Sequence, residues 1–211
     1  MTELATYLPG FIAAYSILLV GASSPGPSVA MLIGIATSEG RAPALLATLG
    51  IALGSVTINI LTMLGVGLIL SQVAWGASAM KIIGSGYLLW LAYGAFRKML
   101  HPPLFQSIAI SRRTPLKHVL VGYLLQVTNP KAIAFWLAIA SIGATDGAST
   151  EIIVLFVAGA FSISFLCHGA WAVALSSSPI RVAYTASRRW IEGALGVFFS
   201  FAAYKLVTSE N

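Results

Sequence analysis

The most constraining feature of this sequence is an uncharged run from Leu4 to Ser38 that two prolines interrupt in its middle. A helix needs roughly 20 apolar residues to cross the hydrocarbon core of a membrane, and this run is longer than that. The segment GASSPGPSVA, at residues 21–30, nevertheless carries Pro25 and Pro27, and a proline in a helix interior breaks the helix. We therefore predict a membrane-spanning segment that is broken near its centre.

Charged residues are sparse along the whole chain, at 9% of 211 residues, whereas a soluble domain carries about 25%. Uncharged stretches long enough to span a bilayer recur from one end to the other. We predict an all-α, polytopic membrane protein with a bundle of six transmembrane helices. The predicted spans are 8–36, 43–70, 80–97, 118–142, 151–177 and 189–206, and the main connections are two basic ones at 98–117 and 176–189.

The amino-terminal stretch MTELATYLPG carries Glu3 and no basic residue. A secretory signal would begin with a positive region, so we expect the first helix to be retained. The single cysteine, Cys167, argues against a disulfide framework, a cysteine-rich metal site and a dithiol redox pair. We expect no cofactor, no metal site and no catalytic residue. We also expect no nucleic-acid partner, because in a membrane protein the placement of the +6 net charge matters more than its sum.

The positive charges gather on one side of the predicted topology. Six spans place the connections at 37–42, 98–117 and 178–188 on the same side, and the opposite side carries only Lys81 and Lys205. The basic residues of the first side are Arg41, Arg97, Lys98, Arg112, Arg113, Lys117, Arg181, Arg188 and Arg189. Because lysine- and arginine-rich loops stay in the cytoplasm, we predict that both termini lie outside it.

The two halves of the chain resemble each other. SPGPSVAMLIGIA at 24–36 and NPKAIAFWLAIAS at 129–141 both begin with a polar residue and a proline, 105 residues apart. IGSGYLLWLAYGAFR at 83–97 matches IEGALGVFFSFAAYK at 191–205, at a spacing of 108. Three spans in each half give halves of opposite orientation, which is typical of transporters, although chance similarity between apolar segments is the alternative. We expect a single transporter domain with repeats at about 1–98 and 118–211, joined by a cytoplasmic loop at 99–117.

Each break is also a predicted helix start. Proline is tolerated at the first helical position and Ser or Asn is favoured before it, so Ser24–Pro25 and Asn129–Pro130 fit the start of two half-helices. The backbone just before each proline should be unwound. Two helix N-termini that face each other at mid-depth predict an anion site, and Gly26 and Pro27 suit a first turn whose N–H groups point at a ligand.

Lys131 adds a full positive charge to this predicted site. It follows Lys117 by 14 residues, or about 20 Å along a helix, which places it deep in the membrane. A lysine at the bilayer centre costs about 2.5–3.5 kcal/mol and needs a partner. Since Glu192 is the only carboxylate within a predicted span, apart from Glu151 at the very edge of another, the expected partner is a substrate carboxylate. Backbone carbonyls of the unwound segment are the alternative.

The order and spacing of these motifs resemble the LysE/RhtB family of bacterial amino-acid exporters over nearly the whole chain. The markers are Pro25-Gly26-Pro27, Asn129-Pro130-Lys131-Ala132, Gly50, Gly54, Gly84 and Tyr87. The resemblance implies an inner-membrane amino-acid exporter driven by the proton gradient. This sequence departs from the family at Ser28, where asparagine is usual, at Ala44 and Ala92, which replace frequent glycines, and at SIGATDG, which replaces a proline-containing end. These departures leave the identity of the substrate open.

The predicted substrate-binding residues flank the two breaks: Ser24, Pro25, Gly26, Pro27, Ser28, Gln126, Thr128, Asn129, Pro130 and Lys131. Three polar residues inside other spans are candidates for proton coupling or polar lining: Asn59, His168 and Glu192. His168 either carries the coupled proton or serves as a neutral hydrogen-bonding group. Glu192 follows Arg188 by four positions, so an ion pair along the helix is the alternative to a role in transport.

We predict a secondary active exporter of neutral amino acids of the homoserine or threonine kind, coupled to protons, and not an enzyme. Export of basic amino acids stays open, although such a side chain would need an acidic partner and the spans offer little beyond Glu192. A metal-ion exporter would need clustered ligands that these spans lack. A membrane enzyme and a channel are the remaining alternatives, and homo-oligomerisation is left open.

Overall fold

A computed structural model describes residues 3–72, 76–101 and 114–208 of the chain. These residues form eight α-helices and no strand, so the all-α prediction is confirmed. Three of the helices contain stretches long and apolar enough to cross a membrane, at Glu3–Ser23, Arg41–Gly65 and Thr150–Ala174. The helices are α1 (Glu3–Ser23), α2 (Pro27–Ser38), α3 (Arg41–Gln72), α4 (Gly76–Leu100), α5 (Pro115–Val127), α6 (Pro130–Ala140), α7 (Thr150–Ala174) and α8 (Ser178–Thr208).

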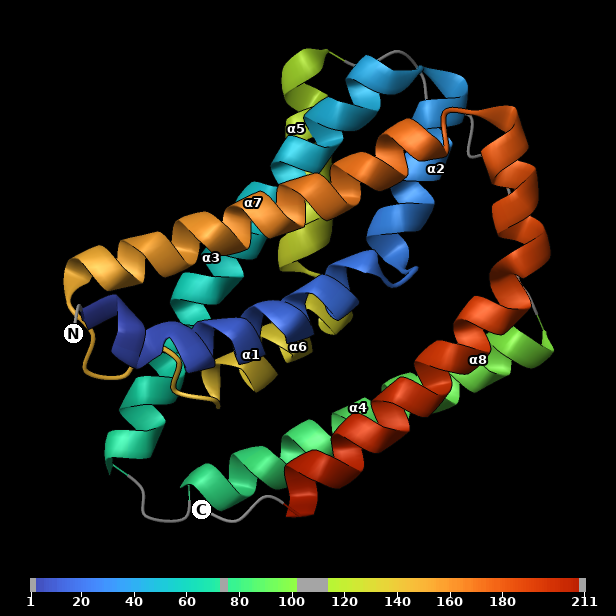
Figure 1. The fold of residues 1–211 in the computed structure, drawn as a ribbon. Coiled ribbons are helices and arrows are strands. Elements are labelled where there is room, and N and C mark those ends of the chain that lie inside the picture. The colour runs from blue at the N-terminus through green and yellow to red at the C-terminus, as the bar shows by residue number, and fades with distance from the viewer. Residues whose placement is uncertain (1–2, 73–75, 102–113, 209–211) are drawn as a thin grey trace.

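The helices are arranged in a main bundle and a separate antiparallel pair (Figure 1). In the bundle, α3 packs against both α5 and α7, while α1, α2 and α6 cover the remaining sides. The pair consists of α4 and α8, which lie along each other for most of their length. Phe135 of α6 connects the two parts, because its ring packs edge-on against Phe199 of α8 with centroids 5.7 Å apart.

Glycines allow α3 and α5 to meet at their backbones. A Cβ atom on Gly50 would overlap the carbonyl of Val119, and one on Gly122 would overlap the carbonyl of Ala47. Small residues at such positions let neighbouring helices approach closely in a membrane. This contact fixes α5, and therefore the start of α6, against the middle of α3.

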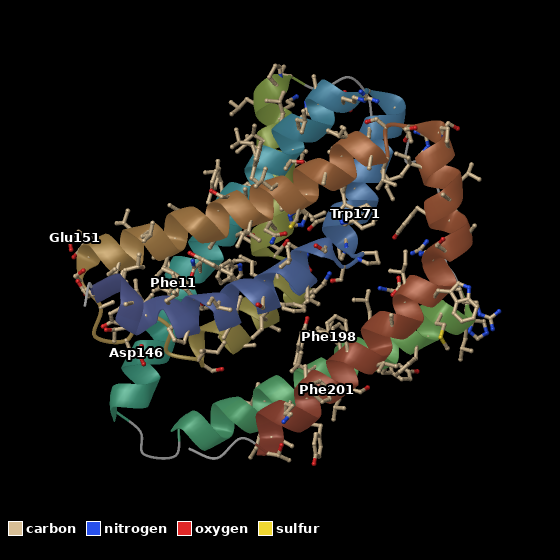
Figure 2. The ribbon with its side chains drawn as sticks, in the orientation of Figure 1. Phe11, Asp146, Glu151, Trp171, Phe198 and Phe201 are labelled. Atoms are coloured by element: carbon tan, nitrogen blue, oxygen red, sulfur yellow. The ribbon has the colours of Figure 1, made fainter. Side chains whose placement is uncertain are left out.

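Large apolar side chains lie both inside and outside the bundle. Phe11 of α1 is buried and packs against Phe156 of α7, with ring centroids 5.0 Å apart, whereas Phe201 of α8 is 58% exposed (Figure 2). Leu64, Leu166 and Trp190 are also more than half exposed. Large exposed apolar surfaces mark contacts with membranes or partners, and here they suit contact with lipid.

A polar contact joins distant parts of the chain at each of two ends of the bundle. At one end, both carboxylate oxygens of Glu3 accept bonds of 3.0 Å from Ser149, one from its N–H and one from its hydroxyl. Asp146 and Glu151 lie at this end, near the amino terminus of the described chain (Figure 2). At the other end, Nε2 of His118 on α5 lies 3.2 Å from the carboxylate of Glu39, just after α2, and both side chains are buried.

Two sequence predictions about helix boundaries are wrong. Residues 178–188, predicted as a basic connection, form the first turns of α8. This stretch is helical because Arg181 donates a 2.9 Å bond to the carbonyl of Leu175 at the end of α7, and because Tyr184 packs edge-on against Trp171. In addition, α1 begins at Glu3 instead of near residue 8. The predicted loop at 99–117 falls mostly on residues outside the described ranges.

Candidate functional site: a polar cavity where two helices begin

The segment between α1 and α2 is short and not helical. α1 ends at Ser23, and Gly26 occupies the position before α2 with φ −165° and ψ −167°. We predicted that Ser24 would cap the helix and that Pro25 would be its first residue, but α2 begins two residues later. The Ser24 hydroxyl instead donates a 2.9 Å bond to the carbonyl of Gly21 and closes the end of α1.

Asn129 occupies the corresponding position between α5 and α6. Its Oδ1 accepts a 3.1 Å bond from the backbone N–H of Lys131 and so caps α6. Its Nδ2 donates a 3.4 Å bond to the hydroxyl of Ser28 in the first turn of α2. One side chain therefore joins the N-terminal ends of two helices that are far apart in the sequence.

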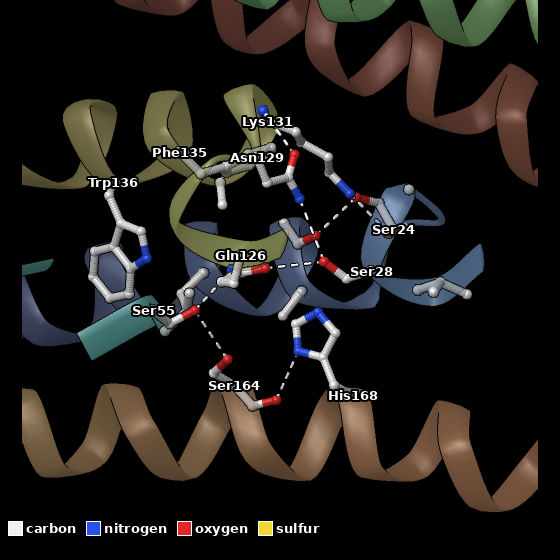
Figure 3. Close-up of a pocket in the computed structure, with 16 residues that line it drawn as sticks. Ser24, Ser28, Ser55, Gln126, Asn129, Lys131, Phe135, Trp136, Ser164 and His168 are labelled. Carbon is white, nitrogen blue, oxygen red and sulfur yellow. Dashed lines mark hydrogen bonds between the residues drawn. The ribbon is translucent and has the colours of Figure 1, made fainter. Parts of the chain in front are cut away.

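A polar cavity of about 30 Å³ lies where these two helix starts meet (Figure 3). This volume holds one or two water molecules. Its polar lining residues are Ser24, Gly26, Ser28, Ser55, Gln126, Asn129, Lys131, Ser164 and His168. Apolar side chains complete the wall, among them Leu18, Phe135 and Trp136.

Lys131 is the cationic group of the cavity. Its Nζ donates a 2.8 Å bond to the carbonyl of Ser24 and lies 6.0 Å from the centre of the Phe135 ring. Gly26 makes room for it, since a Cβ atom there would lie 3.2 Å from Nζ. In the described part of the chain, no carboxylate lies within ion-pair distance of this ammonium. An ammonium group has three N–H donors, so two of them are available to an anionic ligand.

Hydroxyl and amide groups from four helices form a continuous chain of hydrogen bonds across the cavity (Figure 3). The hydroxyl of Ser28 donates a 2.9 Å bond to Oε1 of Gln126, and Nε2 of Gln126 donates a 2.8 Å bond to the hydroxyl of Ser55. The hydroxyl of Ser164 also donates to Ser55, at 3.2 Å. All four side chains are buried, and together they form a polar surface within an apolar bundle.

His168 contributes a ring nitrogen to the same cavity. Its Nδ1 lies 2.8 Å from the backbone carbonyl of Ser164. A carbonyl oxygen can only accept, so Nδ1 carries a proton, and in the neutral ring Nε2 is therefore an acceptor. The ring is 5% exposed and lines the cavity, where Nε2 can accept a hydrogen bond from an N–H or O–H group of a ligand.

Most of the residues that we predicted around the breaks line this cavity, but four do not. The side chain of Thr128 is exposed and donates a 2.7 Å bond to the carbonyl of Leu124 in its own helix. Pro25 is buried and Pro27 exposed, and neither lines the cavity. Pro130 faces a separate apolar cavity of about 670 Å³ between α3, α4 and α6. We assign the site to the small cavity, because it holds the cation and the hydrogen-bonding groups.

Two of the three candidate coupling residues lie apart from the cavity. Asn59 is fully buried on α3, and its side-chain atoms have no hydrogen-bond partner among the described residues. It does not line the cavity, whereas His168, at the corresponding position of α7, does. Glu192 is 2% exposed on α8, with its Oε1 3.9 Å from Nε of Arg188. This contact fits an ion pair along the helix, which the four-residue spacing of Arg188 and Glu192 suggested as the alternative to a role in transport.

Two residues of the candidate site, Ser55 and Ser164, were not predicted from the sequence. Both lie in the middle of long uncharged stretches, where a serine gives no strong signal. They are 109 residues apart, the same spacing that separates Asn59 from His168. This shared spacing within the proposed repeat is the signal that identifies them.

The amino-acid sequence is similar to those of several known proteins. The chain is 28% identical over 210 residues to the threonine efflux protein of Escherichia coli (strain K12), covering 95% of this chain and 98% of the relative. It is 27% identical over 202 residues to the threonine efflux protein of Salmonella typhi, covering 91% and 94%. It is 24% identical over 187 residues to the uncharacterized membrane protein YahN of Escherichia coli (strain K12), covering 87% and 82%.

No solved structure matches the chain. The family model described as LysE type translocator matches residues 19–210, which is most of the sequence. The resemblance inferred from the proline motifs is therefore confirmed, and the protein belongs to the LysE type translocator family.

Proposed function

We propose that this protein is a secondary active exporter of neutral amino acids of the homoserine or threonine kind, coupled to protons. The observation that carries the proposal is Lys131, a cation inside an apolar bundle that has a carbonyl partner and, among the described residues, no carboxylate partner. A charge inside a membrane protein is expensive and usually functional. The threonine efflux relatives support an amino acid as cargo.

The cavity offers separate partners for the two charged groups of an amino acid. The substrate carboxylate binds the two remaining N–H groups of Lys131 and the first-turn amides of α2, which no side chain caps. The substrate ammonium donates to Nε2 of His168 and to the carbonyl of Ser24, which has a second lone pair. His168 therefore orients the substrate as a neutral hydrogen-bonding group in this scheme.

The chain crosses the inner membrane six times, in two inverted repeats at about 1–98 and 118–211. In this topology, α1 with α2 and α5 with α6 are the two broken spans, and α3, α4, α7 and α8 are the others. The ends of the helices at both breaks support this topology. So does the packing of α3 on α7 and of α4 on α8, since these are corresponding helices of the two repeats. The basic loops face the cytoplasm and both termini lie outside.

Transport proceeds by alternating access, in which the two repeats rock around the central site. The cavity of about 30 Å³ is too small for an amino acid, so substrate enters when one end of the bundle opens. Two contacts must break in turn for the ends to open. They are the contact of Glu39 with His118 at one end and the contact of Glu3 with Ser149 at the other.

A neutral substrate fits this cavity better than a basic one. The side chain of lysine or arginine would need a carboxylate inside the site. Among the described residues that line the cavity, none is Asp or Glu. Export of basic amino acids is therefore the weaker alternative.

The proposal is tested in inside-out membrane vesicles with a panel of labelled amino acids outside and an imposed gradient, acid inside. Wild-type protein should accumulate a neutral amino acid, and accumulation should collapse without the gradient. Lys131→Ala should abolish it, because the carboxylate loses its cation. Lys205→Ala, at an exposed lysine of α8, is the matched control and should transport normally. Failure to accumulate any amino acid, or full activity of Lys131→Ala, would contradict the proposal.

A further inference from the structure

We propose that Ser55 and Ser164 recognise a hydroxyl group on the substrate side chain, and so select hydroxy amino acids over aliphatic ones of the same shape. This inference rests on the proposed export function and names the residues that set its specificity.

Ser55 holds an unused donor. A serine hydroxyl has one O–H and two lone pairs. The Ser55 oxygen accepts bonds from Nε2 of Gln126 at 2.8 Å and from the hydroxyl of Ser164 at 3.2 Å, which occupies both lone pairs. Its own O–H has no acceptor among the described residues, although the residue is only 2% exposed.

Ser164 holds the complementary unused acceptor. Its hydroxyl gives its one proton to Ser55, and no described residue donates a hydrogen bond to its oxygen. The residue is fully buried and lines the cavity. An unused donor and an unused acceptor therefore stand on neighbouring oxygens, 3.2 Å apart.

A hydroxyl group matches this pair, because it donates and accepts at once. It would give its proton to the Ser164 oxygen and accept the proton of Ser55. An aliphatic side chain would bury both groups unpaired, which is strongly unfavourable in a water-poor site. Leu18 and Trp136 lie in the wall of the same cavity and suit a methyl group beside the hydroxyl.

The position of the two serines fits the rest of the substrate. In Figure 3, Lys131 and Ser24 lie on one side of the cavity, whereas Ser55 and Ser164 lie across from them. The carboxylate and the side-chain hydroxyl of one amino acid can thus be bound together once the cavity has opened. Since Ser55 is on α3 and Ser164 on α7, the hydroxyl also contacts both halves of the chain.

The test is export of L-threonine and L-valine by the full-length protein in proteoliposomes. Valine has the shape of threonine with a methyl group in place of the hydroxyl. Wild-type protein should prefer threonine by about tenfold or more, as expected for one or two hydrogen bonds. Ser55→Ala and Ser164→Ala should each lower the threonine-to-valine ratio by about tenfold, through loss of threonine transport. Because this is a ratio, it does not depend on how much protein is inserted.

Ser162→Ala is the matched control, since this exposed serine lies one half-turn before Ser164 and, among the described residues, bonds only to the carbonyl of Ala158 in its own helix. It should keep the wild-type ratio. The inference is overturned if wild-type protein transports both amino acids equally, or if both cavity variants keep the wild-type ratio. Wild-type protein that transports no amino acid at all would instead overturn the export function, and the hydroxyl site with it.

Discussion

At the scale of single residues, Asn129 shows how one side chain links helix formation to the site. Its oxygen caps α6 and its nitrogen reaches Ser28 at the start of α2. The first contact is local and stabilises a helix end. The second joins two helices and fixes the start of α6, with Lys131, relative to the uncapped first-turn amides of α2, the two groups on which the proposed carboxylate site depends.

These two roles of Asn129 can be separated by substitution. Asn129→Ala should lower the free energy of unfolding by about 1 kcal/mol, the usual effect of removing an N-cap. It should also slow export, because the bond to Ser28 is lost. Asn129→Ser can still cap α6 but is too short to reach Ser28, so it should keep most of the stability and lose export activity. Unfolding of the purified protein in detergent, together with vesicle transport, measures both effects, and an unaltered Asn129→Ala protein would refute this account.

At the scale of elements, α3 and α5 make a close backbone contact. The two backbones touch at Gly50 and Gly122, where neither helix has room for a Cβ atom. By contrast, a Cβ atom on Gly94 of α4 would meet nothing within 4 Å. Packing therefore requires glycine at positions 50 and 122 but not at position 94.

Gly50→Ala should therefore destabilise the protein by about 1–3 kcal/mol, the range for overpacking a well-filled contact. Gly94→Ala should cause no loss, since its new methyl group projects into open space. Denaturant or thermal unfolding in detergent compares the two variants directly. Equal stability of both would mean that α3 and α5 do not meet at their backbones in the membrane.

At the scale of the whole molecule, charge is distributed by end. Glu3, Asp146 and Glu151 lie at the end that carries the amino terminus, and Arg41 and Lys117 begin helices at the other. Under the positive-inside rule, this asymmetry orients the proposed six-span bundle with its basic end in the cytoplasm.

Reporter fusions test that orientation. An enzyme that is active only outside the cytoplasm should be active when fused after Asn211, because six crossings return the chain to its starting side. The same enzyme fused after His101, at the end of α4, should be inactive, because three crossings place it in the cytoplasm. The opposite pattern would reverse the orientation, and activity at neither site would remove one of the proposed crossings.

The sequence by itself determined the helical class and the family of this protein. Long stretches of high hydropathy and sparse charge predict apolar helices. The proline motifs carry the family resemblance. The same local rules singled out Lys131, Asn129 and Ser28, which line the cavity. Helix starts depend on residues a few positions apart, so such features are readable from the chain alone.

Only the tertiary structure decided which side chains share the cavity. Ser55 and Ser164 give no local signal in the sequence. Thr128 lies only two residues after Gln126, yet Gln126 lines the cavity and Thr128 does not. The basic stretch at 178–188 is helical because Tyr184 packs against Trp171 of another helix, although its composition suggested a connection. The direction of a side chain is set by how whole helices pack, and that packing depends on contacts such as the one between Gly50 and Val119, which join residues far apart in the sequence.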